Sequence, residues 1–171
     1  LTAGNVGLLK HASNVPGCAT AIEEVFREAG YPEGVFQSLL IPSDLVDDII
    51  ADDRLRAATL TGSGPAGRAV ASTAGENLKK TVLELGGSDP FVVLDDADIG
   101  QAAETGAWAR NMNGGQSCIA AKRFVVHTDV YDEFLDTFLA EVESLTVGDP
   151  TDEDTEVGPQ ARADLMEEFH E

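Results

Sequence analysis

Short apolar stretches alternate with amphipathic helical patterns through the first half of the chain, and this alternation constrains the fold most strongly. Residues 5–9 predict a strand, and Pro16 opens a helix whose apolar residues recur every three to four positions until Gly30. Further strands are predicted at 35–41, 56–60 and 80–85, with helices at 43–52 and 65–77 between them. Strands separated by helices at this spacing are typical of βαβ units in a mostly parallel sheet.

The pattern changes after Gly86-Gly87, and we place a domain boundary between residues 87 and 88. The second part predicts a strand at 91–94, an Asp-capped helix at 98–112, a strand at 123–127, an amphipathic helix at 129–144 and a turn-rich acidic connection at 145–160. The sequence therefore predicts an α/β fold: a parallel, Rossmann-like sheet in residues 1–87, followed by the first part of a second α/β domain in residues 88–171.

Several side chains have predicted positions in these elements. Ser43 is expected to cap the helix that begins there. Helical spacing predicts that Cys18, Trp108, Phe134 and Phe138 lie in the core. The acidic cluster at Asp95, Asp96 and Asp98 is interpreted as a helix N-cap, and His11, His127 and His170 as packing or surface residues, so no metal site is expected.

The chain carries 31 acidic residues against 11 Lys and Arg, a formal net charge of −20. This charge excludes a nucleic-acid scaffold that binds through a basic patch. The acidic residues are spread evenly, and a folded protein with so much self-repulsion suggests a halophilic source, where salt screens exposed charges. An acidic mesophilic surface is the alternative, and an unchanged melting temperature between low and molar KCl would favour it.

The sequence also indicates where the protein resides. It contains no apolar run near the roughly 18 residues that span a bilayer, so we expect no membrane association. Cys18 and Cys118 are far apart, which argues against a disulfide framework and favours the cytoplasm. Because the chain begins with Leu1 and ends inside a helical pattern, we expect it to be an interior piece of a longer protein.

Residues 111–121 form an uncharged, polar and glycine-rich stretch in a chain where 25% of the residues are charged. Such a stretch suits a site that excludes water and still offers backbone N–H groups. It contains Cys118, whose thiol becomes a nucleophile when backbone dipoles or a cationic cofactor stabilise the thiolate. A small buried apolar residue is the alternative interpretation.

A second motif, Gly62-Ser63-Gly64-Pro65-Ala66-Gly67, follows a predicted strand and opens a predicted helix. This arrangement lets backbone and a helix N-terminus approach the phosphates of a dinucleotide. An ordinary tight turn between a strand and a helix is the alternative. On the dinucleotide interpretation, Glu84 at the end of the next strand is a candidate ligand for the ribose.

Four segments together resemble the NAD(P)-dependent aldehyde dehydrogenase superfamily in their order and spacing. They are the strand 5–9 ending in Lys10, Thr61-Gly62-Ser63 with Gly67, Leu83-Glu84-Leu85-Gly86-Gly87, and Gly115-Gln116-Ser117-Cys118 with Arg123. Within that superfamily, residues 10–14 and 84–91 are most similar to the succinate-semialdehyde dehydrogenase branch. The resemblance implies that residues 1–87 are part of an NAD(P)-binding domain and that residues 88–171 begin the catalytic domain.

The resemblance also implies roles for individual residues. Cys118 becomes the nucleophile, which forms a thiohemiacetal and, after hydride transfer, a thioester, and Glu84 becomes the general base of hydrolysis rather than a ribose ligand. The Cys118 N–H is a candidate oxyanion donor, and Arg123 is expected to help position the site. Cofactor contacts are assigned to Lys10, Ser13, Thr61, Gly62, Ser63, Gly67 and Leu85.

The cofactor prediction is NADP or NAD. Ser13 stands where many NAD-preferring relatives carry Glu, and a serine beside Lys10 can donate to a 2′-phosphate that a carboxylate would repel. We therefore expect NADP to be accepted. A basic group is needed for an acidic substrate, and Arg110 is the candidate within this chain.

The resulting prediction is an enzyme that oxidises a small-molecule aldehyde, succinate semialdehyde first, to its acid, and that assembles as a homo-oligomer. Another aldehyde is an alternative substrate. A truncated, catalytically inactive nucleotide-binding chain is an alternative of another class. A reductase acting on acyl phosphates is the third, and Glu84 within Leu-Glu-Leu-Gly-Gly argues against it.

Overall fold

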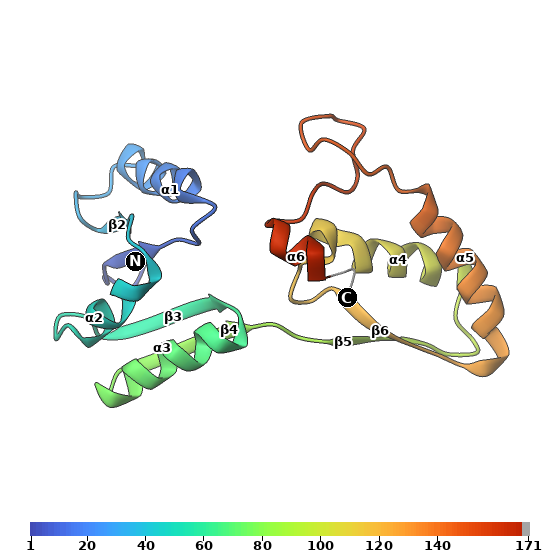
Figure 1. Ribbon diagram of the computed structural model, residues 1–171, viewed down its shortest axis with the longest axis horizontal. Coiled ribbons are helices and arrows are strands. Elements are labelled where there is room, and N and C mark those ends of the chain that lie inside the picture. Colours follow the sequence, from blue (N-terminus) through green and yellow to red (C-terminus); the bar gives the residue numbers. More distant parts are fainter. Residues whose placement is uncertain (169–171) are drawn as a thin grey trace. The chain divides into compact units, whose positions relative to one another are not determined.

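The computed structural model describes residues 1–168 and divides into two compact units, Leu1–Glu84 and Leu85–Glu171. The division lies three residues before the boundary predicted at 87/88. His170, interpreted above as a packing or surface residue, lies outside the described residues. Parallel strands connected by helices confirm the predicted α/β class (Figure 1).

In the first unit the strands associate in two pairs. Strand β1 (Gly7–Lys10) runs parallel to β2 (Phe36–Leu39), in a register that places Gly7 opposite Phe36 and Lys10 opposite Leu39. Strand β3 (Ala57–Gly62) pairs with β4 (Lys80–Leu85). The connections are α1 (Pro16–Glu28), the short 3₁₀ helix η1 (Ser43–Leu45), α2 (Val46–Ala51) and α3 (Gly64–Glu76).

Helix α1 forms where the sequence predicts it. Pro16 occupies its first turn, where a missing N–H costs nothing, and Gly30, at φ 83°, follows its last residues in a left-handed conformation. The helix packs on β2 through Ala19, which is 2% exposed, and through Phe26, whose ring stacks on Phe36 at a centroid distance of 4.8 Å. These contacts fix the connection that leads from β1 to β2.

Two predictions for this unit are wrong. Ser43 makes no capping hydrogen bond with its side chain, and the segment instead begins with a 3₁₀ turn after Pro42. The Ser43 hydroxyl accepts a hydrogen bond from the Lys10 ammonium, so a long-range partner has taken the place of the local one. Cys18 is exposed rather than in the core, because the α1 face that packs on β2 is the one carrying Ala19.

Charged side chains form hydrogen bonds at the C-terminal end of α2. The Lys79 ammonium donates to the backbone carbonyls of Ile50 and Asp52, where a helix leaves its last carbonyls unpaired. The Arg54 guanidinium and backbone N–H donate to the Asp52 carboxylate, and these hydrogen bonds hold the pKa of Asp52 well below its usual range. The connection between α2 and β3 is therefore held by hydrogen bonds as well as by packing.

The second unit is built on strands β5 (Asp89–Val93) and β6 (Ala121–Val126), which run parallel. The connection from β5 to β6 contains α4 (Ile99–Asn111) and the 3₁₀ helix η2 (Met112–Gly115). After β6 come the 3₁₀ helix η3 (Thr128–Val130), α5 (Tyr131–Ser144) and α6 (Ala163–Glu167). The Asp98 carboxylate accepts from the Gln101 N–H at 3.1 Å, which confirms the predicted N-cap of α4. The bridge between Val147 and Val157 closes the acidic connection that follows α5.

Alternation along β5 and β6 places the core of this unit on one face of the strand pair. Val92 and Val125 are more than half exposed, whereas Val93 is buried and Phe91 and Phe124 pack against it. Helices α4 and α5 cover that inner face (Figure 1). The remaining members of the cluster include Ala103, Phe134, Phe138, Val126 and Ile99.

The predictions for aromatic side chains in this unit have different outcomes. Phe134 is 3% exposed and Phe138 packs against the core, as the helical spacing predicts. Trp108 is 65% exposed and the prediction for it is wrong, since the inward face of α4 carries the small residues Ala103, Gly106 and Ala107. No helix within residues 1–168 is long and apolar enough to cross a bilayer.

Candidate active site

The cysteine loop, residues 112–120, begins with an unusual backbone. Asn113, Gly114 and Gly115 have φ values of 55°, 63° and 74°, three consecutive residues in the left-handed region. Glycine adopts this conformation at little cost, and Asn tolerates it better than most residues. The chain thereby leaves the end of α4 in a tight turn and brings Cys118 to an exposed position before β6.

Arg110, in the last turn of α4, forms hydrogen bonds with the backbone of the loop and of β6. Its guanidinium donates to the Gly115 carbonyl at 3.4 Å and to the Ala121 carbonyl at 3.1 Å, so one side chain links the left-handed turn to the first residue of β6. The sequence makes Arg110 a candidate for holding the substrate carboxylate. In the structure its guanidinium donates to backbone carbonyls of the loop and of β6. No sequence motif indicates that an arginine will hold a loop in this way.

A later segment of the chain also fastens the loop. The Gln160 amide donates to the Gly114 carbonyl at 2.9 Å, and the Ala161 N–H donates to the Gln116 side-chain oxygen at 2.9 Å. Gln116 in turn donates to the Asn113 carbonyl at 3.0 Å. The glutamine of the Gly-Gln-Ser-Cys motif therefore links the left-handed turn to residue 161.

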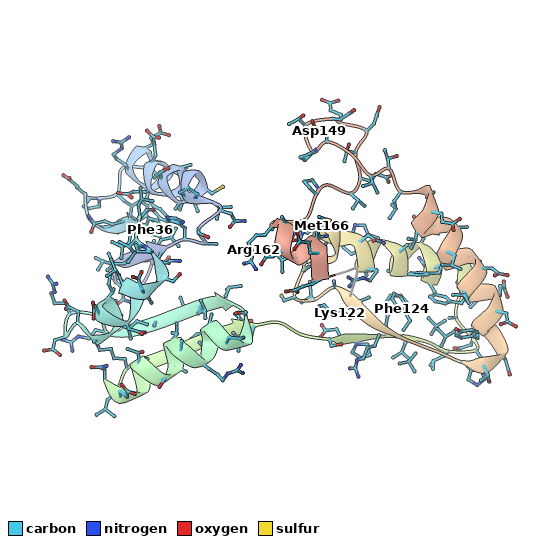
Figure 2. The ribbon with its side chains drawn as sticks, viewed as in Figure 1. Phe36, Lys122, Phe124, Asp149, Arg162 and Met166 are labelled. Carbon is cyan, nitrogen blue, oxygen red and sulfur yellow. The ribbon has the colours of Figure 1, made fainter. Side chains whose placement is uncertain are left out.

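A cavity of about 350 Å³ adjoins this part of the loop. It is lined by Asn113, Gly114, Pro150, Glu156, Gly158 and Pro159. Asp149 (Figure 2) precedes Pro150 in the sequence, and the Thr151 N–H and hydroxyl donate to its carboxylate, which lowers the pKa of that carboxyl. The Glu156 carboxylate accepts a hydrogen bond from the Thr146 N–H at 2.9 Å, so it stabilises the turn-rich connection that follows α5.

The peptide that precedes Cys118 is held at its oxygen. The Lys122 ammonium, at the start of β6 (Figure 2), donates to the carbonyls of Ser117 at 3.1 Å and Cys118 at 3.0 Å, with a longer contact of 3.5 Å to that of Ala120. The Ala120 N–H also donates to the Ser117 carbonyl, at 3.1 Å. The Cys118 N–H, by contrast, has no hydrogen-bond acceptor within residues 1–168.

The Gly-Gly segment after Glu84 lies against the same loop. A Cβ atom added to Gly87 would lie 3.2 Å from the Cys118 carbonyl oxygen, so only glycine fits without a shift. The Arg123 guanidinium donates to the Ser88 carbonyl at 2.9 Å and holds this segment to β6. Leu85, a predicted cofactor contact, begins this unit and is half-buried, whereas Glu84 is exposed at the end of the first unit. The role of Glu84 as a general base stays a prediction.

The first unit contains the other predicted cofactor residues. Lys10 ends β1, and its ammonium lies 3.1 Å from the Ser43 hydroxyl, a residue whose contribution sequence analysis missed. Ser13 is exposed three residues later and has no hydrogen-bond partner in the described part of the chain. The C-terminal end of β1 therefore carries the Lys10 ammonium, which contacts the Ser43 hydroxyl. The Ser13 hydroxyl follows three residues later in the sequence.

The Gly-rich motif adopts the predicted strand, turn and helix. Thr61 and Gly62 end β3, the Ser63 hydroxyl caps α3 by accepting from the Ala66 N–H at 3.4 Å, and Gly67 is buried within the helix. The N-terminus of a helix favours anions through its unpaired N–H groups. The Lys10 ammonium, the exposed Ser13 hydroxyl and the N–H groups at the start of α3 are each donors of the kind that bind phosphate.

The sequence model of the aldehyde dehydrogenase family matches residues 1–171. The chain belongs to this family. A succinate-semialdehyde dehydrogenase [NADP(+)] of Mycobacterium avium strain 104 is 59% identical over 161 residues, which cover 94% of this chain and 34% of that protein. The chain therefore spans about one third of the length of the curated relatives it matches.

Solved structures of aldehyde dehydrogenases have the same fold. The succinic semialdehyde dehydrogenase from Streptococcus pyogenes in complex with NADP+ superposes with a TM-score of 0.92 at 40% identity, over 98% of this chain and 38% of that one. An NAD-dependent aldehyde dehydrogenase from Sinorhizobium meliloti gives 0.93 at 31% identity, over 96% of this chain and 33% of that one. The family predicted from the four sequence segments is confirmed.

Gly115→Ala tests how the loop depends on its left-handed turn. The new Cβ would lie 2.6 Å from a guanidinium nitrogen of Arg110, at a φ of 74° that alanine disfavours. We expect a loss of about 1–3 kcal/mol in the free energy of unfolding, measured by urea denaturation of the full-length protein.

Gly100→Ala in α4 is the matched control. Its Cβ would meet the Asp98 carboxylate at an ordinary 3.6 Å, so we expect the stability to stay equal or to rise by up to about 1 kcal/mol. Equal stabilities of the Gly115→Ala and Gly100→Ala variants would contradict the described turn.

Proposed function

We propose that the full-length protein oxidises succinate semialdehyde to succinate with NADP+, using Cys118 as the nucleophile. The observation that supports this most is the cysteine loop itself. Cys118 is exposed, its N–H is free within the described residues, and the neighbouring carbonyls are bound by Arg110, Lys122 and Gln160. Such a loop presents a thiol beside an unpaired donor, and it does so on a chain of the aldehyde dehydrogenase family.

In the proposed reaction the Cys118 thiolate attacks the aldehyde carbon. A C–S bond forms, and the electron pair of the C=O bond moves onto oxygen, where the Cys118 N–H is available as a donor to the oxyanion. When bound, the nicotinamide cofactor supplies the acceptor for the hydride that this adduct loses. The product on the enzyme is a thioester of Cys118.

Hydrolysis of the thioester needs a deprotonated water. We assign this step to Glu84: its carboxylate takes a proton from water, and the resulting hydroxide attacks the thioester carbonyl. The C–S bond then breaks, Cys118 leaves as the thiolate, and the carboxylic acid is released. Glu84 is a suitable candidate because its chain continues directly into the Gly-Gly segment that lies on the cysteine loop.

Lys10, Ser13, Thr61, Gly62, Ser63, Gly67 and Leu85 are proposed to hold the cofactor. Lys10 and Ser13 would hold the adenosine ribose and its 2′-phosphate, and the capped N-terminus of α3 would face the pyrophosphate. The Ser43 hydroxyl accepts from the Lys10 ammonium, so it helps to fix the direction of that cation. The mycobacterial relative and the streptococcal structure are both described with NADP+, which agrees with this assignment.

The test of this function is an assay of the full-length protein for NADPH formation with succinate semialdehyde, next to a panel of neutral aldehydes such as lactaldehyde. Preferred turnover of the semialdehyde supports the proposal. Turnover of a neutral aldehyde alone indicates another substrate, and cofactor binding without any turnover supports the alternative of an inactive nucleotide-binding chain.

Ser13→Glu tests the assignment of the 2′-phosphate. A carboxylate at this position would repel the phosphate, and we expect the dissociation constant of NADPH to rise about tenfold or more. The constant for NADH should change little, because NADH lacks that phosphate. Both are measured by titrating cofactor fluorescence. Ser13→Ala is the control, with a smaller loss, and equal losses for both cofactors would contradict the assignment.

A further inference from the structure

The contact between Lys122 and the peptide before Cys118 has no explanation in packing or ion pairing. Lys122 is exposed, and within residues 1–168 its ammonium pairs with no carboxylate, although the chain has 31 acidic residues. Instead it donates to the carbonyls of Ser117 and Cys118 at 3.1 and 3.0 Å. A flexible, charged side chain loses rotamer freedom when it is held in this way, so the contact has an entropic cost.

We infer that Lys122 is a positioning residue that orients and polarises the Cys118 N–H as an oxyanion donor. The inference rests on the proposed function of Cys118. It assigns Lys122 no contact with the substrate, because the residue acts through the peptide bond between Ser117 and Cys118.

The geometry of the peptide bond transmits this effect. The Ser117 carbonyl and the Cys118 N–H belong to one planar trans unit and point in opposite directions. Hydrogen bonds that fix the carbonyl oxygen therefore also fix the direction of the N–H. Two donors hold that oxygen, Lys122 and the N–H of Ala120, a residue with 0% exposure.

The charge of Lys122 adds a second effect. A cation that donates to a carbonyl oxygen draws electron density towards that oxygen and makes the N–H of the same peptide a stronger donor. This N–H has no acceptor in the described part of the chain, so its capacity is available to an oxyanion. The increase matters most when negative charge develops on the substrate oxygen.

The experiment uses Lys122→Met in the full-length protein and compares two reactions of Cys118 that need no cofactor. With p-nitrophenyl acetate, the thiolate attacks the ester carbonyl and forms a C–S bond and an oxyanion. The C–O bond then breaks and p-nitrophenolate leaves, which gives a measurable burst. With iodoacetamide, the thiolate displaces iodide at a saturated carbon and no oxyanion forms.

We expect Lys122→Met to lower the rate of the p-nitrophenolate burst about tenfold, less than the loss of a direct oxyanion donor, and to change the alkylation rate by less than about twofold. Lys122→Arg should restore part of the burst rate, because it keeps the charge and the donors. Lys80→Met on β4 is the control, since the Lys80 side chain is exposed and has no hydrogen-bond or ion-pair partner within residues 1–168, and it should change neither rate.

Three results would overturn the inference: an unchanged burst rate, a parallel fall in the alkylation rate, or a wild-type protein without a burst that depends on Cys118. The proposed function is judged separately by NADPH formation from aldehydes. If wild type shows the burst but oxidises no aldehyde, the proposed function fails while the effect of Lys122 on the burst can still be present.

Discussion

Cys118→Ser is expected to abolish the formation of NADPH from succinate semialdehyde by the full-length protein, with turnover at least about 10⁴-fold below wild type. A serine hydroxyl keeps its proton at neutral pH, and the cysteine loop offers it no base within the described residues. A cysteine thiolate, in contrast, is an effective nucleophile towards a carbonyl carbon. Binding of NADPH should be unchanged, which a fluorescence titration measures.

Cys18→Ser is the matched control for this prediction. Cys18 is the other cysteine of the chain, lies exposed on α1 and has no assigned role, so turnover should stay within about twofold of wild type. Turnover retained by Cys118→Ser, or lost equally in both variants, would exclude Cys118 as the nucleophile.

Glu84→Gln is expected to have the second largest effect and to stop the reaction after the thioester has formed. Without a base to deprotonate water, turnover should fall about 10²–10⁴-fold. The first turnover should still release one equivalent of NADPH per active site, since acylation does not use Glu84. Rapid-mixing absorbance measures this burst, and mass spectrometry should find the succinyl group on the peptide that contains Cys118.

Two outcomes would contradict the assignment of Glu84. A raised KM for NADP+ with an unchanged turnover would identify it as a ribose ligand instead, and the absence of acylated protein would show that acylation itself had failed. Glu76→Gln at the end of α3 serves as the control, because it removes one exposed carboxylate from the same unit. It should leave both the burst and the steady-state rate unchanged.

The local signals in the sequence were sufficient to place the elements. Helix periodicity, the Pro16 start and the Gly30 stop located α1, and Asp98 located the start of α4. These rules act over a few residues, so one sequence is enough to apply them. The combination of the Gly-rich motif with Glu84 and Cys118 was also sufficient to identify the family.

Contacts between distant residues are the features that one sequence does not reveal. Serine is a residue type that often caps helices, but Ser43 accepts a hydrogen bond from Lys10, 33 positions away. The positive charge of Arg110 suggests that it binds an anion, yet its guanidinium donates to the backbone carbonyls of Gly115 and Ala121. Periodicity shows that a helix has two faces but not which face is covered. Cys18 and Trp108 were therefore placed in the core, although both are exposed.

The link between Gly114 and Gln160 has a consequence for how the protein is made. Arg110, Gln116 and Lys122 reach the cysteine loop from neighbouring positions, whereas Gln160 lies 46 residues after Gly114. A ribosome adds residues from the N-terminus at about 5–20 per second, so several seconds separate the synthesis of Gly114 from that of Gln160. Cys118 therefore leaves the exit tunnel before Gln160 can bind the loop, and the loop reaches its described geometry only after this distant segment has emerged.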